Sequence, residues 1–181
     1  MDYLLTSTDI LTKKITLIGL DNAGKTSILR NWEHGPSKDP LDPIRPTKLV
    51  KTNKMDIKGY KCIIWDFGGQ SSFREQYLEK INYYFSYADI IVYVIDIQDP
   101  GRYDEAIKYL LDIINVIKIQ KLLPKFVIFL HKYDPRLRNS EEINANIDKI
   151  SQRLKNIFEK EKFNLKMFKT SIYDKITTEI F

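Results

Sequence analysis

Apolar residues gather in six short runs, each about the length of a β-strand and bounded by polar turn residues. These runs cover residues 14–19, 48–55, 59–66, 89–96, 125–131 and 165–170. Apolar runs of about four to eight residues between turn signals are typical of buried strands. The pattern therefore predicts a sheet of six strands.

Three helix-length segments separate several of these runs, at residues 25–33, 103–119 and 140–161. The last starts with the letters NSEEI, which supply an N-cap residue and acids for the first turn. Strands that alternate with helices favour a parallel sheet covered by helices on both faces. The stretch MDIKGYKCII is the exception, because Lys58 and Gly59 form a tight-turn signal between two strand patterns. It predicts a hairpin and therefore one antiparallel edge strand.

Composition limits the chain to one globular domain. It has 181 residues, of which 43% are hydrophobic and 29% charged, so it is far from the low-hydrophobicity signature of disorder. The net charge of +5 comes with scattered lysines, which is compatible with a solvated surface or with an attraction to anionic lipid or nucleic acid. The single Cys62 excludes an internal disulfide, so a cytoplasmic location is expected. Asp2 stands where N-myristoylation needs glycine, so any membrane contact is expected to be peripheral.

A phosphate-binding loop is the strongest chemical signal. The stretch ITLIGLDNAGKTSIL contains GxxxxGK[ST] after a predicted strand and at the head of a predicted helix, which is the context the motif requires. Gly19 and Gly24 allow tight turns, so that backbone N–H groups converge on phosphate oxygens at a helix N-terminus. Lys25 supplies a cation for the β and γ phosphates, and Thr26 offers a hydroxyl to Mg²⁺.

A second motif narrows the choice among nucleotide-binding proteins. In CIIWDFGGQ, Asp66 ends a strand and is followed by Gly69 and Gln70. The acid can reach the metal through a water, Gly69 can present its N–H to a γ phosphate, and Gln70 can orient the attacking water. Phe67, Phe73 and Tyr77 accompany this motif, either as a partner-docking surface or as packing against a neighbouring helix.

The stretch HGPSKDPLDPIRPTK contains four prolines in fifteen residues and cannot form a helix or a central strand. Long loops in compact domains are often functional. Thr47, near its end, is positioned to complete the Mg²⁺ shell, which would tie the order of the loop to the bound nucleotide.

These motifs resemble the Ras superfamily of small GTPases, and within it the branch of the ADP-ribosylation-factor (Arf), Sar and Rag families. GLDNAGKT and WDFGGQ closely resemble Arf motifs, whereas HKYD, KTSIYD and FREQY are more similar to Rag GTPases. The resemblance implies a three-layer P-loop NTPase fold and a switch that binds GTP and GDP with Mg²⁺. It also implies slow GTP hydrolysis, together with an activating protein, an exchange factor and effectors. Pairing with a related GTPase is a further expectation; a nucleic-acid partner is not expected.

The family's functional positions carry over onto matching residues. For phosphates the resemblance points to Gly19, Leu20, Asp21, Asn22, Ala23, Gly24, Lys25, Thr26 and Ser27. For the metal and the γ-phosphate site it points to Thr26, Thr47, Asp66, Gly69 and Gln70. For the base it points to His131, Lys132, Asp134, Ser171 and Ile172. Asp134 is decisive, because one carboxylate can accept from both N1–H and the exocyclic amine of guanine.

The two ends depart from the family pattern. Residues 1–12 are interpreted as an N-terminal extension, either a membrane-binding helix or an arm that packs on its own domain. Residues 13–181 are interpreted as the G domain, without a complete last helix. Two other functions stay open: a scaffold subunit that holds nucleotide without hydrolysing it, and an adenine-nucleotide enzyme.

Overall fold

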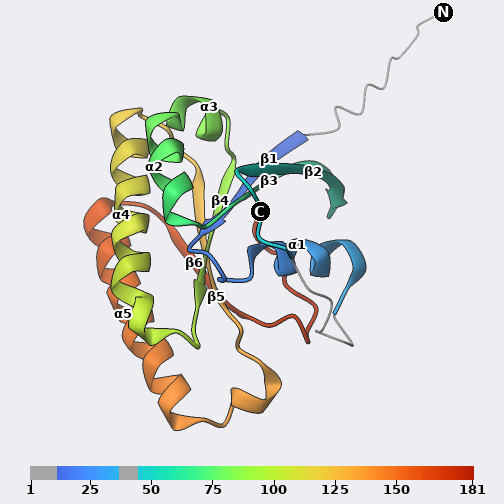
Figure 1. Ribbon diagram of the computed structural model, residues 1–181, viewed down its shortest axis with the longest axis vertical. Coiled ribbons are helices and arrows are strands. Elements are labelled where there is room, and N and C mark those ends of the chain that lie inside the picture. Colours follow the sequence, from blue (N-terminus) through green and yellow to red (C-terminus); the bar gives the residue numbers. More distant parts are fainter. Residues whose placement is uncertain (1–11, 37–44) are drawn as a thin grey trace, which may run out of the picture.

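A six-stranded sheet forms the centre of the protein in the computed structural model, which describes residues 12–36 and 45–181 (Figure 1). The strands lie in the order β2-β3-β1-β4-β5-β6. Their bounds are β1 Thr12–Gly19, β2 Val50–Ile57, β3 Tyr60–Phe67, β4 Ile90–Asp96, β5 Lys125–His131 and β6 Leu165–Thr170. The six predicted strands are all present.

One pair of strands is antiparallel and the other pairs are parallel. β1 pairs in parallel with β3 and β4, and the parallel arrangement continues through β5 to β6. β2 runs antiparallel to β3, and the two-residue turn between them has positive φ at Lys58 and Gly59. Positive φ at both central residues matches the twist of a hairpin. The predicted hairpin and antiparallel edge strand are confirmed.

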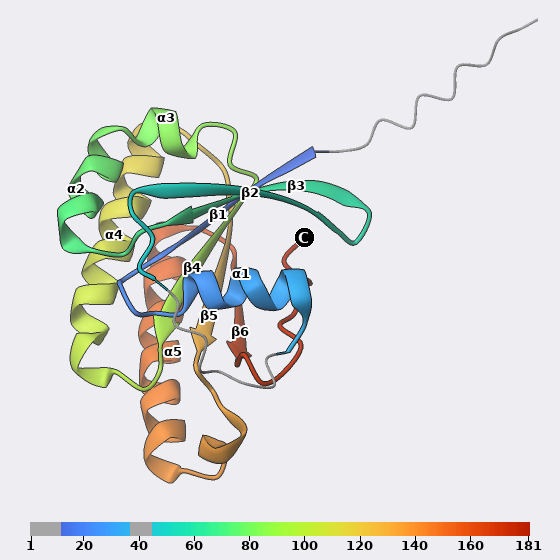
Figure 2. The ribbon, with the colours of Figure 1, turned by 45° about the vertical axis from the view of Figure 1, so that its right-hand side comes forward.

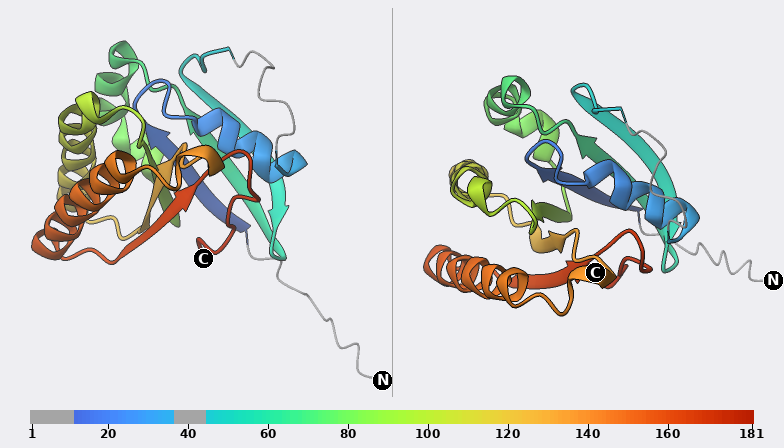
Figure 3. Two further views of the ribbon diagram at one scale, coloured as in Figure 1. Left: turned by 90° about the horizontal axis from the view of Figure 1, so that it is seen from below. Right: turned by 60° about the horizontal axis from the view of Figure 1, so that its bottom comes forward.

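Helices cover both faces of the sheet, as Figures 2 and 3 show. On one face lies α1 (Lys25–His34), and on the other lie α4 (Tyr103–Ile119) and α5 (Glu141–Glu161). The short elements are α2 (Ser71–Glu79), α3 (Ile81–Phe85) and the 3-10 turns η1 (Pro100–Arg102) and η2 (Pro135–Leu137). None of the helices in residues 12–36 and 45–181 has the length and apolar character needed to cross a membrane.

The hydrophobic pattern did not predict α2 and α3. Tyr77 is the one fully buried side chain that α2 contributes, so its sequence lacks an apolar stripe. Phe67 and Tyr77 are both fully buried and their rings are 4.8 Å apart. These two aromatics are part of the core, so the partner-docking interpretation is wrong for them.

The segment after β6 covers part of the sheet beside α1. Residues 171–181 form turns and irregular chain rather than a helix, and Ile176 and Ile180 are buried in the same core as α1. Asn31 of α1 fixes this segment, because its amide donates to the carbonyls of Ile172 and Asp174 and accepts from the N–H of Ile176. The final segment is thereby part of the fold that supports the phosphate-binding loop.

Candidate functional site

The predicted phosphate-binding loop connects the carboxyl end of β1 to α1. Parallel α/β folds bind their ligands at the carboxyl ends of the strands. At two positions of the loop, close neighbouring atoms leave no room for a side chain, so glycine is required. A Cβ on Gly19, which has φ of +154°, would lie 2.3 Å from the carbonyl oxygen of Val94 in β4. A Cβ on Gly24, with φ of +91°, would lie 2.4 Å from Cδ2 of His131. The loop is therefore packed against two neighbouring strands.

A cavity of about 260 Å³ opens beside this loop and is lined by the predicted phosphate and metal residues. Its lining comprises Asp21, Asn22, Gly24, Lys25, Thr26, Ser27, Arg45, Pro46, Thr47, Phe67, Gly68, Gly69 and Gln70. Leu20 and Ala23, also predicted from the motif, are buried with their side chains in the core. Neither residue lines the cavity with its side chain.

Lys25 is the buried cation among the residues that line the cavity, which also include the exposed Arg45. Its side chain is buried, and Nζ donates to the carbonyls of Gly19 at 3.1 Å and Leu20 at 2.5 Å. Burial lowers its pKa to about 8, although the charges of Asp66 and Asp21 act in the opposite direction. A buried ammonium held only by neutral carbonyls is suited to pairing with an anion such as a phosphate.

Three oxygen-bearing side chains from separate segments meet at the inner end of the cavity. Thr26 Oγ1 donates to Asp66 Oδ2 at 2.7 Å, Thr47 Oγ1 lies 3.1 Å from the same oxygen, and the two hydroxyls are 3.0 Å apart. Asp66 Oδ1 is buried without a hydrogen-bond partner. Burial raises the pKa of Asp66, against the hydrogen bond from Thr26 and the charge of Lys25. A set of hydroxyl and carboxylate oxygens with one unsatisfied acceptor fits Mg²⁺.

Gly69 and Gln70 also line the cavity. The N–H of Asp21 donates to the carbonyl of Gly69 at 3.0 Å, and a Cβ on Gly69 would approach that nitrogen to 2.2 Å. Only a glycine allows this contact between the two backbones. Gln70 is exposed, lines the cavity, precedes α2 as its N-cap and makes no side-chain capping bond.

The predicted base-binding residues lie together at the ends of β5 and β6. Asp134 Oδ1 accepts from the hydroxyl of buried Ser171 at 2.7 Å, which fixes the carboxylate. Lys132 Nζ pairs with Asp96 Oδ2 at 2.6 Å. Ile172, next to Ser171, is held through its carbonyl by Asn31. The motifs HKYD and TSI, which are far apart in the sequence, thus form one site.

His131 is buried between the phosphate loop and β6. Its Nδ1 lies 2.9 Å from Thr170 Oγ1, while its other edge faces Gly24. Burial and the charge of Lys132 lower its pKa to about 3, so the ring is neutral at physiological pH. This placement supports a bracing role for His131 at the phosphate loop.

His131 makes the protein sensitive to mild acid. The unfolded chain takes up a proton near the ordinary histidine pKa of about 6.5, whereas the folded ring stays neutral down to about 3. Stability is therefore lost as pH falls below about 6.5, and the free energy of unfolding should drop by about 1 kcal/mol between pH 7 and 5.5 from this group. Urea denaturation of the wild type and of His131→Asn at both pH values measures this drop in the free energy of unfolding. A drop of the same size in the variant would contradict the assignment.

Several residues of the site carry no motif signal. Gln98 Nε2 donates to Asp134 Oδ2 at 3.2 Å and to the carbonyl of Lys132 at 2.8 Å. Asp96 and Thr170 hold Lys132 and His131 in the contacts described above. Only their position in the sequence could have identified these residues. Asp96 and Thr170 stand at the ends of predicted strands, and Gln98 lies two residues after Asp96.

Comparisons with known proteins agree with this geometry. The model of the ADP-ribosylation factor family matches residues 5–177. The chain is 33% identical to ADP-ribosylation factor-like protein 3 of Caenorhabditis elegans over 144 residues, which is 77% of this chain and 73% of that protein. It is 32% identical to ADP-ribosylation factor-like protein 2 of Dictyostelium discoideum over 143 residues, or 75% of this chain and 68% of that protein.

A solved structure shares the fold. The small GTPase Arl6 (BBS3) from Trypanosoma brucei, with the nucleotide analogue GppNp bound, matches with a TM-score of 0.63 at 18% identity. The match covers 93% of this chain and 91% of that chain. The expected small G-protein fold is confirmed. Since the family model spans almost the whole chain and two relatives exceed 30% identity, this chain belongs to the ADP-ribosylation factor family of small GTPases.

Proposed function

We propose that this protein is a Mg²⁺-dependent switch that binds GTP and GDP and hydrolyses GTP slowly. The observation that carries the proposal is the meeting of Thr26, Thr47 and Asp66 beside buried Lys25, in a cavity formed by the phosphate loop. Family membership supports nucleotide binding and GTPase activity in general. The assignment of individual residues below rests on their geometry.

Different groups of the protein bind the phosphates, hold the metal ion and align the attacking water. The N–H groups of Gly24, Lys25 and Thr26 at the head of α1 bind phosphate oxygens, and Lys25 exchanges its carbonyl contacts for the β and γ phosphates. Thr26 and Thr47 would hold Mg²⁺ directly and Asp66 through a water. When bound, the ion neutralises charge that develops on the phosphates. Gln70 aligns a water for in-line attack on the γ phosphate, with the N–H of Gly69 as a donor to the same group.

Thr47 couples the bound nucleotide, GTP or GDP, to the surface that partner proteins contact. Its hydroxyl contacts Thr26 and Asp66, and it follows the proline-rich loop, of which residues 37–44 lie outside the described part of the chain. Loss of the γ phosphate would release Thr47 and change the surface offered to effectors. Intrinsic hydrolysis in such proteins can be as slow as roughly 10⁻⁴ s⁻¹, so an activating protein and an exchange factor are proposed partners.

The location and further partners extend this proposal. A cytoplasmic protein with peripheral membrane contact fits the net charge of +5. The segment 1–11, for which membrane binding was considered, lies outside the described residues. The likeness of HKYD and KTSIYD to Rag GTPases motivates pairing with a related GTPase. A nucleic-acid partner forms no part of the proposal.

Competition binding tests the function. Nucleotide is removed from the purified protein, and GTP, GDP and ATP then compete against fluorescent GDP, with Mg²⁺ or with excess EDTA. GTP and GDP should displace the probe at least about a hundredfold better than ATP, because adenine lacks the donor pair that Asp134 accepts. EDTA should weaken GTP binding. Equal displacement by ATP would overturn the proposal in favour of an adenine-nucleotide enzyme.

A further inference from the structure

The phosphate loop carries a charge that opposes its proposed ligand. Asp21 belongs to the lining of the cavity, along with Lys25 and Gly69. An ionised carboxylate at this place repels the phosphates of a nucleotide, and salt screens this repulsion because the Asp21 side chain is 46% exposed. A loop built to bind phosphates therefore needs a compensating cation for Asp21.

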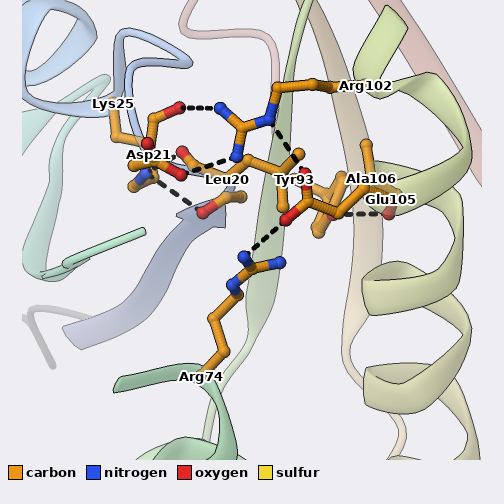
Figure 4. A network of polar contacts seen from close by, with 9 residues as sticks. Leu20, Asp21, Lys25, Arg74, Tyr93, Arg102, Glu105 and Ala106 are labelled. Atoms are coloured by element: carbon orange, nitrogen blue, oxygen red, sulfur yellow. Dashed lines mark hydrogen bonds and ion pairs between the residues drawn. The ribbon is translucent and has the colours of Figure 1, made fainter. Parts of the chain in front are cut away.

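Arg102 provides that cation from a segment 81 residues away in the sequence (Figure 4). It is the last residue of η1, directly before α4. Its Nη2 donates to Asp21 Oδ1 at 2.7 Å, and Nη1 lies 3.5 Å from the carbonyl oxygen of Asp21. The guanidinium therefore contacts both the carboxylate and the backbone of the phosphate loop.

Glu105 fixes the orientation of this guanidinium. It accepts from Arg102 Nε at 2.9 Å and from Arg74 Nη2 at 2.6 Å, so that α2 and α4 both hold the arrangement (Figure 4). The hydrogen bond from Arg102 is the main cause that lowers the pKa of Glu105 to about 2. Burial alone would raise the pKa of Asp21, but the hydrogen bond and charge of Arg102 outweigh it, and the pKa falls. Both carboxylates are ionised at neutral pH.

We propose that Arg102 is a positioning residue, which neutralises Asp21 and directs its carboxylate away from the phosphates, so that the loop can accept a nucleotide. The contacts of Arg102 with Asp21 and Glu105 carry the proposal. It deepens the proposed function and rests on it. Arg102 itself needs no contact with the nucleotide.

A double-mutant cycle on GDP affinity tests this role, using the full chain with Mg²⁺. Arg102→Ala should weaken GDP binding about tenfold, because an uncompensated carboxylate then faces the phosphates. Asp21→Asn should bind GDP at least as tightly as the wild type. The double variant should bind within about threefold of Asp21→Asn, because no charge is left to compensate.

Salt separates a charge effect from a structural one. The tenfold deficit of Arg102→Ala should shrink in 0.5 M NaCl, since screening weakens the repulsion. Arg153→Ala is the matched control: it removes an exposed ion pair between Arg153 of α5 and Asp104 of α4, and it should leave GDP affinity unchanged. Far-UV circular dichroism checks that each variant is folded.

Three results would overturn the inference alone, namely GDP affinity of Arg102→Ala equal to the wild type, a deficit that salt does not change, or a double variant as weak as Arg102→Ala. Absence of GDP binding by the wild type would instead overturn the proposed function, and this inference with it.

Discussion

Replacement of Asp134 by asparagine is expected to change the preferred base from guanine to xanthine. The Ser171 hydroxyl fixes one carboxylate oxygen and the Gln98 amide contacts the other, so the side chain is oriented before a base arrives. Guanine offers two donors on the edge that a carboxylate reads, whereas xanthine carries a carbonyl in place of the exocyclic amine. An asparagine supplies one donor and one acceptor and matches xanthine. GDP affinity should fall at least about a hundredfold.

Displacement of fluorescent GDP or fluorescent XDP from wild type and Asp134→Asn measures this change. His131→Asn is the control, because His131 braces the phosphate loop and contacts Thr170. That variant should still prefer guanine. Retention of GDP preference by Asp134→Asn would show that base choice depends on other groups of the site.

Replacement of Gln70 by leucine is expected to slow single-turnover GTP hydrolysis at least about tenfold, because the attacking water loses the amide that aligns it. GTP affinity should remain close to that of the wild type. The structure gives the reason: Gln70 is an exposed N-cap residue without a side-chain capping bond, and the hydrogen bond between Thr26 and Asp66 does not involve it.

Gln76→Leu is the matched control for this experiment. Gln76 is a second exposed glutamine, on α2 itself and outside the cavity lining, so its replacement should leave the hydrolysis rate unchanged. Equal rates for the wild type and Gln70→Leu would show that Gln70 does not position water. GTP retained over many hours by both proteins would favour a scaffold subunit that does not hydrolyse nucleotide.

The sheet could be predicted well because each strand is encoded locally. Most residues of β1, β4 and β5 are buried, so each of these strands appears as an apolar run, and the hairpin depended on two adjacent turn residues. The helices α2 and α3 were missed for the opposite reason. Tyr77 alone anchors α2 fully in the core, so tertiary contacts rather than a repeating apolar stripe stabilise this helix.

The base site was predicted in part. His131, Lys132, Asp134 and Ser171 belong to motifs and were identified from them. Gln98 was missed, since a lone glutamine after a strand has no distinctive pattern. Its contact with Asp134 exists because β4 and β5 are parallel neighbours, with Asp96 opposite His131 in the register.

By itself, the sequence determined the phosphate-binding loop, the order of the six strands and of the three longest helices along the chain, and the identity of the residues proposed to act on a nucleotide. Such features are encoded by neighbouring residues, whose spacing fixes local backbone geometry and chemistry. Tertiary structure alone decided that Asp66 meets Thr26, through the parallel pairing of β1 with β3, and that Arg102 meets Asp21. These contacts join distant segments, and only the packing of the sheet and its helices sets the distances between them.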